Sequence, residues 1–150
     1  MSRTTIVAGL ISVALTVMLS ACGMGSANLR GPDGKLAFCE SGPHCVSSET
    51  LNPARYIAPI IYNGSREAAQ AAMVKIISGM NGAKIVTDEP GYIHAEFTTS
   101  IMHYVDDLEM VFPDEKTIQV RSSSRIGYYD YDTNRDRVEA IRKAFVAIQP

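Results

Sequence analysis

The chain has 150 residues, with 14 basic and 16 acidic side chains and a formal net charge of −2 at pH 7. This length predicts a single domain of ordinary size. A slightly acidic chain lacks the excess of cations that binding to a phosphate backbone requires, so nucleic acid is not an expected partner.

The first 22 residues have the layout of a bacterial export signal. Arg3 is followed by an uncharged apolar run from Ile6 to Leu19 and then by Leu19-Ser20-Ala21-Cys22. This order predicts a secretory signal over residues 1–21. The apolar run is too short for a transmembrane helix, because a bilayer span needs about 20 apolar residues. The last four residues resemble the lipobox of lipoprotein signals, whose cysteine is lipidated. We expect a lipid anchor on Cys22; the alternative is a plain secretory signal with a coincidental cysteine.

The expected location is the cell envelope. Several acyl chains on Cys22 would hold the protein on a membrane almost irreversibly, at about 0.8 kcal/mol per buried methylene. Gly23 is not the aspartate that resembles an inner-membrane retention signal, which favours the periplasmic side of the outer membrane. Residues 22–37 contain four glycines and a proline and show no apolar period, so we expect a lipidated N-terminus and flexible tether there and one domain over residues 38–150.

Two further cysteines, Cys39 and Cys45, lie in the segment FCESGPHCVSS. An oxidising compartment lets this pair form a disulfide, and closing so short a loop should stabilise the fold by about 2 kcal/mol. The alternative is a metal site that uses His44, but zinc takes four ligands and no second cluster follows. We therefore expect a disulfide, and neither a metal nor another cofactor.

A short strand and an amphipathic helix come next. Residues 58–62 are an apolar strand candidate, and Ser65 can cap a helix that carries Glu67 in its first turn. Apolar side chains then recur at helical spacing and predict a helix of about four turns that ends at Gly79 or Gly82. These side chains are Ala69, Ala72, Met73, Ile76, Ile77 and Met80.

Four strands follow without an intervening helix. Residues 84–88 and 92–99 flank the turn sequence EPG and predict a hairpin. Residues 104–112 and 117–125 predict a second hairpin, and the alternation of apolar and polar side chains gives each strand one face of each kind.

A last helix is predicted after Asp132 or Thr133, either of which can cap it. Its apolar stripe contains Val138, Ile141, Phe145 and Ile148. The order β-α-β-β-β-β-α predicts a two-layer α+β fold, in which two helices pack on one face of an antiparallel sheet of four to five strands.

The stretch from Arg121 to Arg142 allows two hypotheses, and the first is internal bracing. Keeping the apolar side chains of the last hairpin on one face fixes its register. Glu109 then lies opposite Arg121, Asp107 lies opposite Ser123, and Arg125 lies diagonal to Asp107. Exposed pairs of this kind stabilise a sheet by about 0.2 to 1 kcal/mol each.

The second hypothesis is a site for a phosphate, a carboxylate or a lipid head group. Guanidinium groups bind such anions through paired hydrogen bonds. The candidate residues are Arg121, Arg125, Tyr128, Tyr131, Asn134, Arg135 and Arg137. Charge runs of mixed sign are usually braced or solvated faces, which favours bracing.

Five motifs, in order, resemble a known family. They are CVSS at 45–48, IAPI at 57–60, YIHAEF at 92–97, VDDLE at 105–109 and RSSSRIGYYDYDTNRDRVEAIR at 121–142. Together they resemble the uncharacterised bacterial and plastid family catalogued as domain of unknown function 1499, from about Phe38 to Phe145. Similar proteins carry a cysteine shortly before CVSS, which supports the Cys39–Cys45 bridge. The departures are small: His44 where Asn is frequent, Ser123 where Ala is usual, and Asp132 where Gly is common.

The resemblance implies no activity, so function rests on the residues. No Gly-x-Ser-x-Gly elbow accompanies the serines and histidines, and Asp106 and Asp107 should point to opposite faces of their strand. His94 and Glu96 could hold a cation with neighbouring acids, but arginines are available to pair with those acids.

We expect a non-catalytic envelope lipoprotein, bound to the membrane through its anchor, that contacts another envelope protein or a small anionic ligand. The alternative is a hydrolase or metal-dependent enzyme that uses the polar face of the sheet. The second alternative is a carrier that holds a lipid or another hydrophobic ligand between its sheet and its helices.

Overall fold

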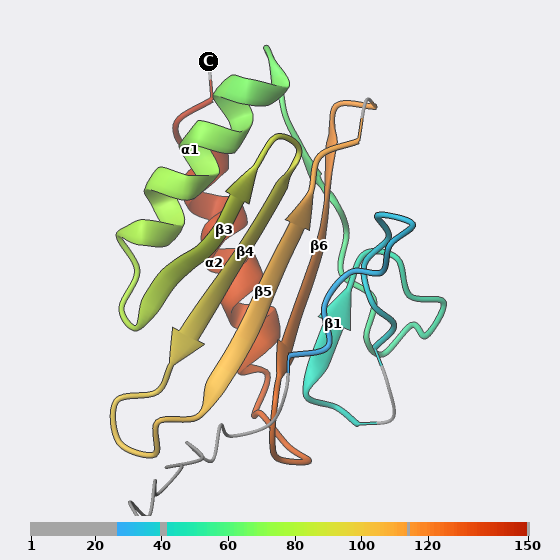
Figure 1. Ribbon diagram of the computed structural model, residues 1–150, viewed down its shortest axis with the longest axis vertical. Helices are drawn as coiled ribbons and strands as arrows, with labels where there is room; N and C mark the ends of the chain where they lie inside the picture. Colours follow the sequence, from blue (N-terminus) through green and yellow to red (C-terminus); the bar gives the residue numbers. More distant parts are fainter. Residues whose placement is uncertain (1–26, 40–41, 114, 150) are drawn as a thin grey trace, which may run out of the picture.

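The computed structural model describes residues 27–39, 42–113 and 115–149 (Figure 1). The predicted signal over residues 1–21 and the predicted lipid anchor at Cys22 lie outside the described residues. No helix of the described part is long and apolar enough to cross a membrane. The elements are β1 (Cys45–Ser47), β2 (Ile60–Ile61), α1 (Arg66–Ser78), β3 (Ala83–Glu89), β4 (Tyr92–Thr98), β5 (Val105–Val111), β6 (Thr117–Ser124) and α2 (Thr133–Val146).

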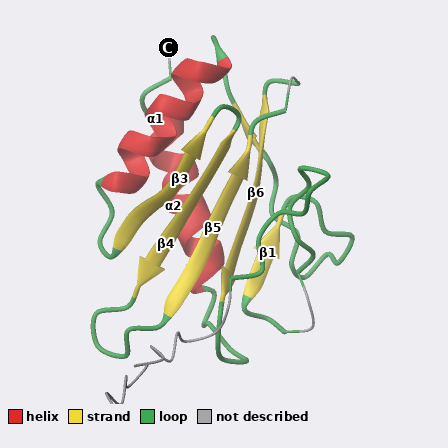
Figure 2. Ribbon diagram, viewed as in Figure 1, coloured by secondary structure: helices red, strands yellow, loops and turns green. Residues whose placement is uncertain are grey.

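The strands form one antiparallel sheet in the order β1-β6-β5-β4-β3, and β2 pairs with the start of β6. Both helices lie on the same side of this sheet (Figure 2). The predicted α+β fold with its four long strands is therefore confirmed. The sequence did not predict β1, because three residues are too few to show the alternation that marks a strand.

The core lies between the sheet and the two helices. Met73 and Ile77 of α1, Val138 and Ile141 of α2, and Leu108 of β5 are all completely buried. They lie on the stripes and alternating positions that the sequence predicts for the core. The last position of the predicted α2 stripe, Ile148, is exposed because the helix ends before it, at Val146.

The two helices begin in different ways. The Ser65 side chain accepts a hydrogen bond from the backbone N–H of Ala68, as predicted, and caps α1. In α2, neither predicted residue caps the helix with its side chain; instead the Asp130 carboxylate accepts from the backbone N–H groups of Asp132 and Asn134 at 3.2 and 3.1 Å. Asp130 can do so because Tyr131 and Asp132 both adopt left-handed backbone angles, which turn the chain tightly.

Residues 27–38, called here the N-terminal strap, lie on the side of the sheet away from the helices (Figure 1, blue). Leu36 is buried, the Asn28 carbonyl accepts a hydrogen bond from Arg121, and the Arg30 guanidinium stacks on the Tyr92 ring. The sequence predicted a flexible tether over residues 22–37, whereas the described part of that range packs against the domain. A disulfide joins Cys39 to Cys45, with Cα atoms 5.5 Å apart, and fastens the end of the strap to β1.

Candidate functional site

The polar face of the sheet holds the candidate catalytic and anion-binding side chains. In the β4–β5 and β5–β6 pairs, Glu96 lies opposite Asp107, Asp107 opposite Ser123, and Glu109 opposite Arg121. The register predicted for the last hairpin is thus confirmed. It follows from the apolar pattern alone, since a shift of one residue would expose the whole core face of β6.

Glu109 is the centre of one charged cluster on this face, and its side chain is completely buried. Its carboxylate accepts hydrogen bonds from the Tyr92 hydroxyl at 2.8 Å, the Arg30 backbone N–H at 2.7 Å and Arg121 Nη1 at 3.3 Å. A buried carboxylate is tolerated when several donors surround it in this way. Burial raises the pKa of Tyr92 well above its usual range, and the Glu109 carboxylate raises that pKa further, so the tyrosine remains a donor.

Asp107 is the centre of a second cluster, on the same face. Its carboxylate accepts from His94 Nε2 at 2.7 Å and from Arg125 Nε and Nη2 at 2.8 and 2.7 Å, and Arg125 also donates to Glu96. Burial acts to raise the pKa of Asp107, but the hydrogen bonds from Arg125 and His94 outweigh it and hold that pKa below its usual range. The imidazole of His94 is therefore already held by a carboxylate.

A third polar cluster lies on the helix side of the sheet, inside the core layer. Arg137 of α2 donates to Asp106 at 2.6 Å, to Asn134 Oδ1 at 2.6 Å and to the Ser122 hydroxyl at 3.0 Å. The amide nitrogen of Asn134 donates in turn to the His44 carbonyl at 3.2 Å and to Asp130 at 2.9 Å. Asn134 is fully buried and ties α2 to β6, to β1 and to its own preceding loop.

Comparison with known families identifies the domain. Residues 35–145 match the family described as "Protein of unknown function (DUF1499)". The chain belongs to this family. A search of the curated proteins finds no match. Within this DUF1499 chain, Asn28 and Arg30 of the strap lie before the matched region, although both complete the charged clusters of the sheet.

The seven predicted anion-binding residues of this DUF1499 chain do not meet at one point. Arg121 and Arg125 share the polar face, whereas Asn134 and Arg137 meet on the opposite face of the sheet. Arg135 donates to the backbone carbonyls of Ala54 and Tyr56. Tyr128 and Tyr131 are exposed in the loop before α2.

Sequence reasoning missed Arg30 and Tyr92 as members of the Glu109 cluster. Arg30 lies in a segment without apolar periodicity, and Tyr92 looked like an ordinary residue of the polar face. One signal was available: Glu96, Asp107 and Glu109 gave the predicted face three acids against the two arginines of β6 and its end. This excess of acids indicated a further donor. Arg30 supplies it through its backbone N–H, which donates to Glu109, while its guanidinium stacks on Tyr92 and pairs with Glu89.

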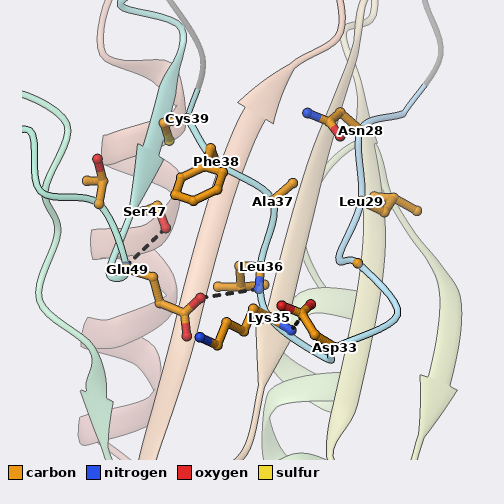
Figure 3. A pocket seen from close by; sticks show the side chains of 12 residues that line it. Asn28, Leu29, Asp33, Lys35, Leu36, Ala37, Phe38, Cys39, Ser47 and Glu49 are labelled. Atoms are coloured by element: carbon orange, nitrogen blue, oxygen red, sulfur yellow. Dashed lines mark hydrogen bonds between the residues drawn. The ribbon is translucent and has the colours of Figure 1, made fainter.

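The strap of the DUF1499 domain borders a cavity of about 730 Å³ (Figure 3). Its wall is formed by the strap on one side and by β1 and the loop after it on the other. Glu49 shapes this wall, because it accepts a hydrogen bond from the Leu36 backbone N–H at 3.2 Å. The ring of Phe38 borders the cavity and is largely exposed, so the space is open to solvent.

A smaller cavity of about 400 Å³ lies where the strap begins, beside the ends of β5 and β6. Its lining includes Asn28, His44, Asp107, Arg121, Ser123 and Arg125. Within the described residues, His44 Nδ1 and Arg121 Nε are the two buried nitrogen atoms without a hydrogen-bond partner. Two of the predicted anion-binding arginines thus line the same hollow.

The described residues contain no group of three or more His, Cys, Asp or Glu side chains placed to hold a metal ion. On the polar face, the oxygens of Glu96, Asp107 and Glu109 accept hydrogen bonds from arginines instead. A metal ligand there would have to displace a paired guanidinium, so the arrangement suits structural support better than metal chemistry.

Proposed function

We propose that the protein is a lipoprotein of the cell envelope, anchored through Cys22, whose DUF1499 domain serves as a non-catalytic binding module. The order of Arg3, the apolar run 6–19 and the sequence Leu19-Ser20-Ala21-Cys22 supports the anchor. Gly23 favours the outer membrane, with the domain facing the periplasm.

One observation carries the non-catalytic part of the proposal: each of the carboxylates Glu96, Asp107 and Glu109 on the polar face is already paired with an arginine. A general base or nucleophile must be able to reach a substrate. His94 is nearly buried and held by Asp107, and Glu109 is surrounded by three donors beneath the N-terminal strap. This arrangement favours a structural role for these side chains over a role in hydrolysis. The carrier hypothesis is also less favoured, because completely buried side chains fill the layer between sheet and helices.

Metabolic labelling tests the anchor. Cells that express the full chain would be grown with an alkyne-bearing fatty acid, and membranes would be separated from soluble protein. We expect label and membrane association for the wild type, and neither for Cys22→Ser. Cys39→Ser is the matched control, because it removes a cysteine outside the lipobox-like sequence and should leave the label in place. A wild-type chain without label would contradict the proposal.

A small anion bound in the 400 Å³ cavity is the second candidate function. The unpartnered Arg121 Nε favours it, because a buried donor without an acceptor is destabilising unless a ligand supplies one. Inorganic phosphate should then raise the urea midpoint of the lipoprotein above its value in chloride at equal ionic strength. Arg121→Lys should lose this response, whereas Arg142→Lys, outside the cavity, should keep it. Equal midpoints of the wild type in both salts would exclude phosphate at this site.

A further inference from the structure

At one end of the domain, the start of the N-terminal strap lies close to two loops. Ala27, the first described residue, lines the same cavity as Ser124 and Arg125, at the end of β6. The Arg125 backbone N–H donates to the Val105 carbonyl, which places the start of β5 at this end as well. The loop 99–104 precedes β5 and the loop 125–132 follows β6, so both lie at the end where the strap begins (Figure 1).

These two loops expose large apolar and aromatic side chains. Ile101 and Tyr131 are each 85% exposed. The set, called here the aromatic end, comprises Ile101, Met102, Tyr104, Tyr128, Tyr129 and Tyr131. Single exposed apolar residues need no explanation, but a group of them at one end of a domain indicates a contact surface.

Both loops are held in fixed shapes. Thr99 accepts a hydrogen bond from the backbone N–H of Tyr104 at 2.9 Å and donates its own backbone N–H to the Tyr104 carbonyl at 2.9 Å. His103, Tyr131 and Asp132 have positive φ angles, which side-chain-bearing residues adopt only at some cost. The exposed rings are thus presented by structured turns, and little freedom is lost when they bind.

The Cys22 position lies five residues before Ala27. Five residues span at most about 18 Å when fully extended, so an anchor at Cys22 keeps the aromatic end close to the bilayer surface. Tyrosine rings are enriched at the level of the lipid head groups, where one edge of the ring is apolar and the hydroxyl is wet.

We infer that the aromatic end lies in the interface of the membrane to which the domain is anchored. This inference rests on the proposed lipidation of Cys22. Ile101 and Met102 enter the acyl boundary, and the tyrosines lie among the head groups. The expected occupant is zwitterionic lipid. The nearby arginines Arg125 and Arg137 are already paired with Asp107 and Asp106, and the loop before α2 adds the acidic Asp130 and Asp132, so this end has no cationic surface to attract anionic head groups.

Single tryptophans can test this orientation, because the chain contains no Trp. The full lipoprotein would be reconstituted into phosphatidylcholine vesicles with brominated acyl chains, which quench nearby tryptophan fluorescence. Ile101→Trp and Tyr131→Trp report on the aromatic end. Ile61→Trp is the matched control, because Ile61 is also exposed but pairs with Thr117 at the opposite end of β6.

We expect the brominated lipid to reduce Ile101→Trp fluorescence by about two-fold or more, Tyr131→Trp less, and Ile61→Trp not at all. Equal quenching of Ile101→Trp and Ile61→Trp would overturn the orientation. Loop tryptophans that are unquenched by lipid yet shielded from iodide would overturn it in favour of a contact with a second copy of the chain. Mass spectrometry of the same sample separates the two proposals: an acylated chain with unquenched loops defeats the orientation alone, whereas an unacylated chain removes the anchor and the inference together.

Discussion

The polar sheet face and the aromatic end differ in solvent exposure, and in both regions the exposure is the opposite of what the residue types suggest. Arg121 and Glu109 are charged, and yet they are buried and paired with each other. Asp107 is likewise buried and is paired with Arg125 and His94. Tyr131 and Ile101 are large and partly or wholly apolar, and yet they are exposed. The charges of the polar face therefore support the internal structure, whereas the exposed apolar side chains of the aromatic end form the surface that we propose contacts the membrane. Substitutions in the two regions should consequently change different measurements.

The largest expected loss of stability comes from Arg121→Ala. Glu109 would remain completely buried with one cation fewer, and breaking a buried ion pair costs about 3 kcal/mol. Urea unfolding of the full chain in detergent measures this loss. Lys75→Ala, an exposed cation on α1, is the control and should change the free energy of unfolding by less than about 0.5 kcal/mol. Similar values for the two variants would show that Arg121 does not brace the fold.

The pKa of Asp107 predicts a smaller, pH-dependent loss. That pKa is lowered in the folded state by Arg125 and His94, against the effect of burial. The unfolded chain therefore takes up the proton first, near the ordinary Asp value of about 3.9. The contribution of Asp107 is complete above that pH and is lost as the pH falls below it toward the folded pKa. Urea midpoints measured from pH 7 to pH 3 should fall less steeply for Asp107→Asn than for the wild type, and parallel curves would contradict the assignment.

Arg30→Ala tests whether the N-terminal strap belongs to the folded domain. The guanidinium lies 3.6 Å from the centre of the Tyr92 ring, and losing a cation–π contact of this kind costs about 1 kcal/mol. The backbone N–H that donates to Glu109 remains, which keeps the loss moderate. Hydrogen exchange at Tyr92 and Glu109 should become faster in this variant. No change in exchange or stability would indicate that the strap rests on the sheet without supporting it.

The smallest effect on stability should come from Tyr131→Ser. The Tyr131 side chain is exposed, and its one ring contact is with Tyr129 at 5.6 Å between centroids, so the urea midpoint should be almost unchanged. Surface changes of this kind usually stay within about 0.5 kcal/mol. A large loss of stability would show that Tyr131 supports the fold, and the contrast between the two regions would then be weaker.

The sequence alone predicted the features that depend on local patterns. The stripe containing Met73 and Ile77 predicted α1, and the alternation through Leu108 and Met110 predicted both β5 and its register against β6. These predictions hold because each residue's place is fixed by burial on one face.

The features that sequence reasoning missed depend on contacts between distant parts of the chain. The Arg30–Glu109 hydrogen bond joins residues 79 positions apart, and the strap has no apolar periodicity that would indicate that it packs. The cap of α2 was misassigned for a local reason, since the left-handed angles of Tyr131 and Asp132 move the capping role to Asp130. The exposure of the aromatic end also needed the structure, because the sequence predicts Tyr128 and Tyr131 as ligands of an anion together with the arginines.

The N-terminal strap also separates the unit of folding from the unit of sequence similarity. The family match begins at residue 35, but Asn28 and Arg30 contribute a carbonyl, an N–H and a cation to the buried face. A protein expressed from residue 35 would keep every family motif and leave Glu109 short of one donor. For homologues of this family, the residues just upstream of the recognisable domain should therefore be retained when the domain is produced on its own.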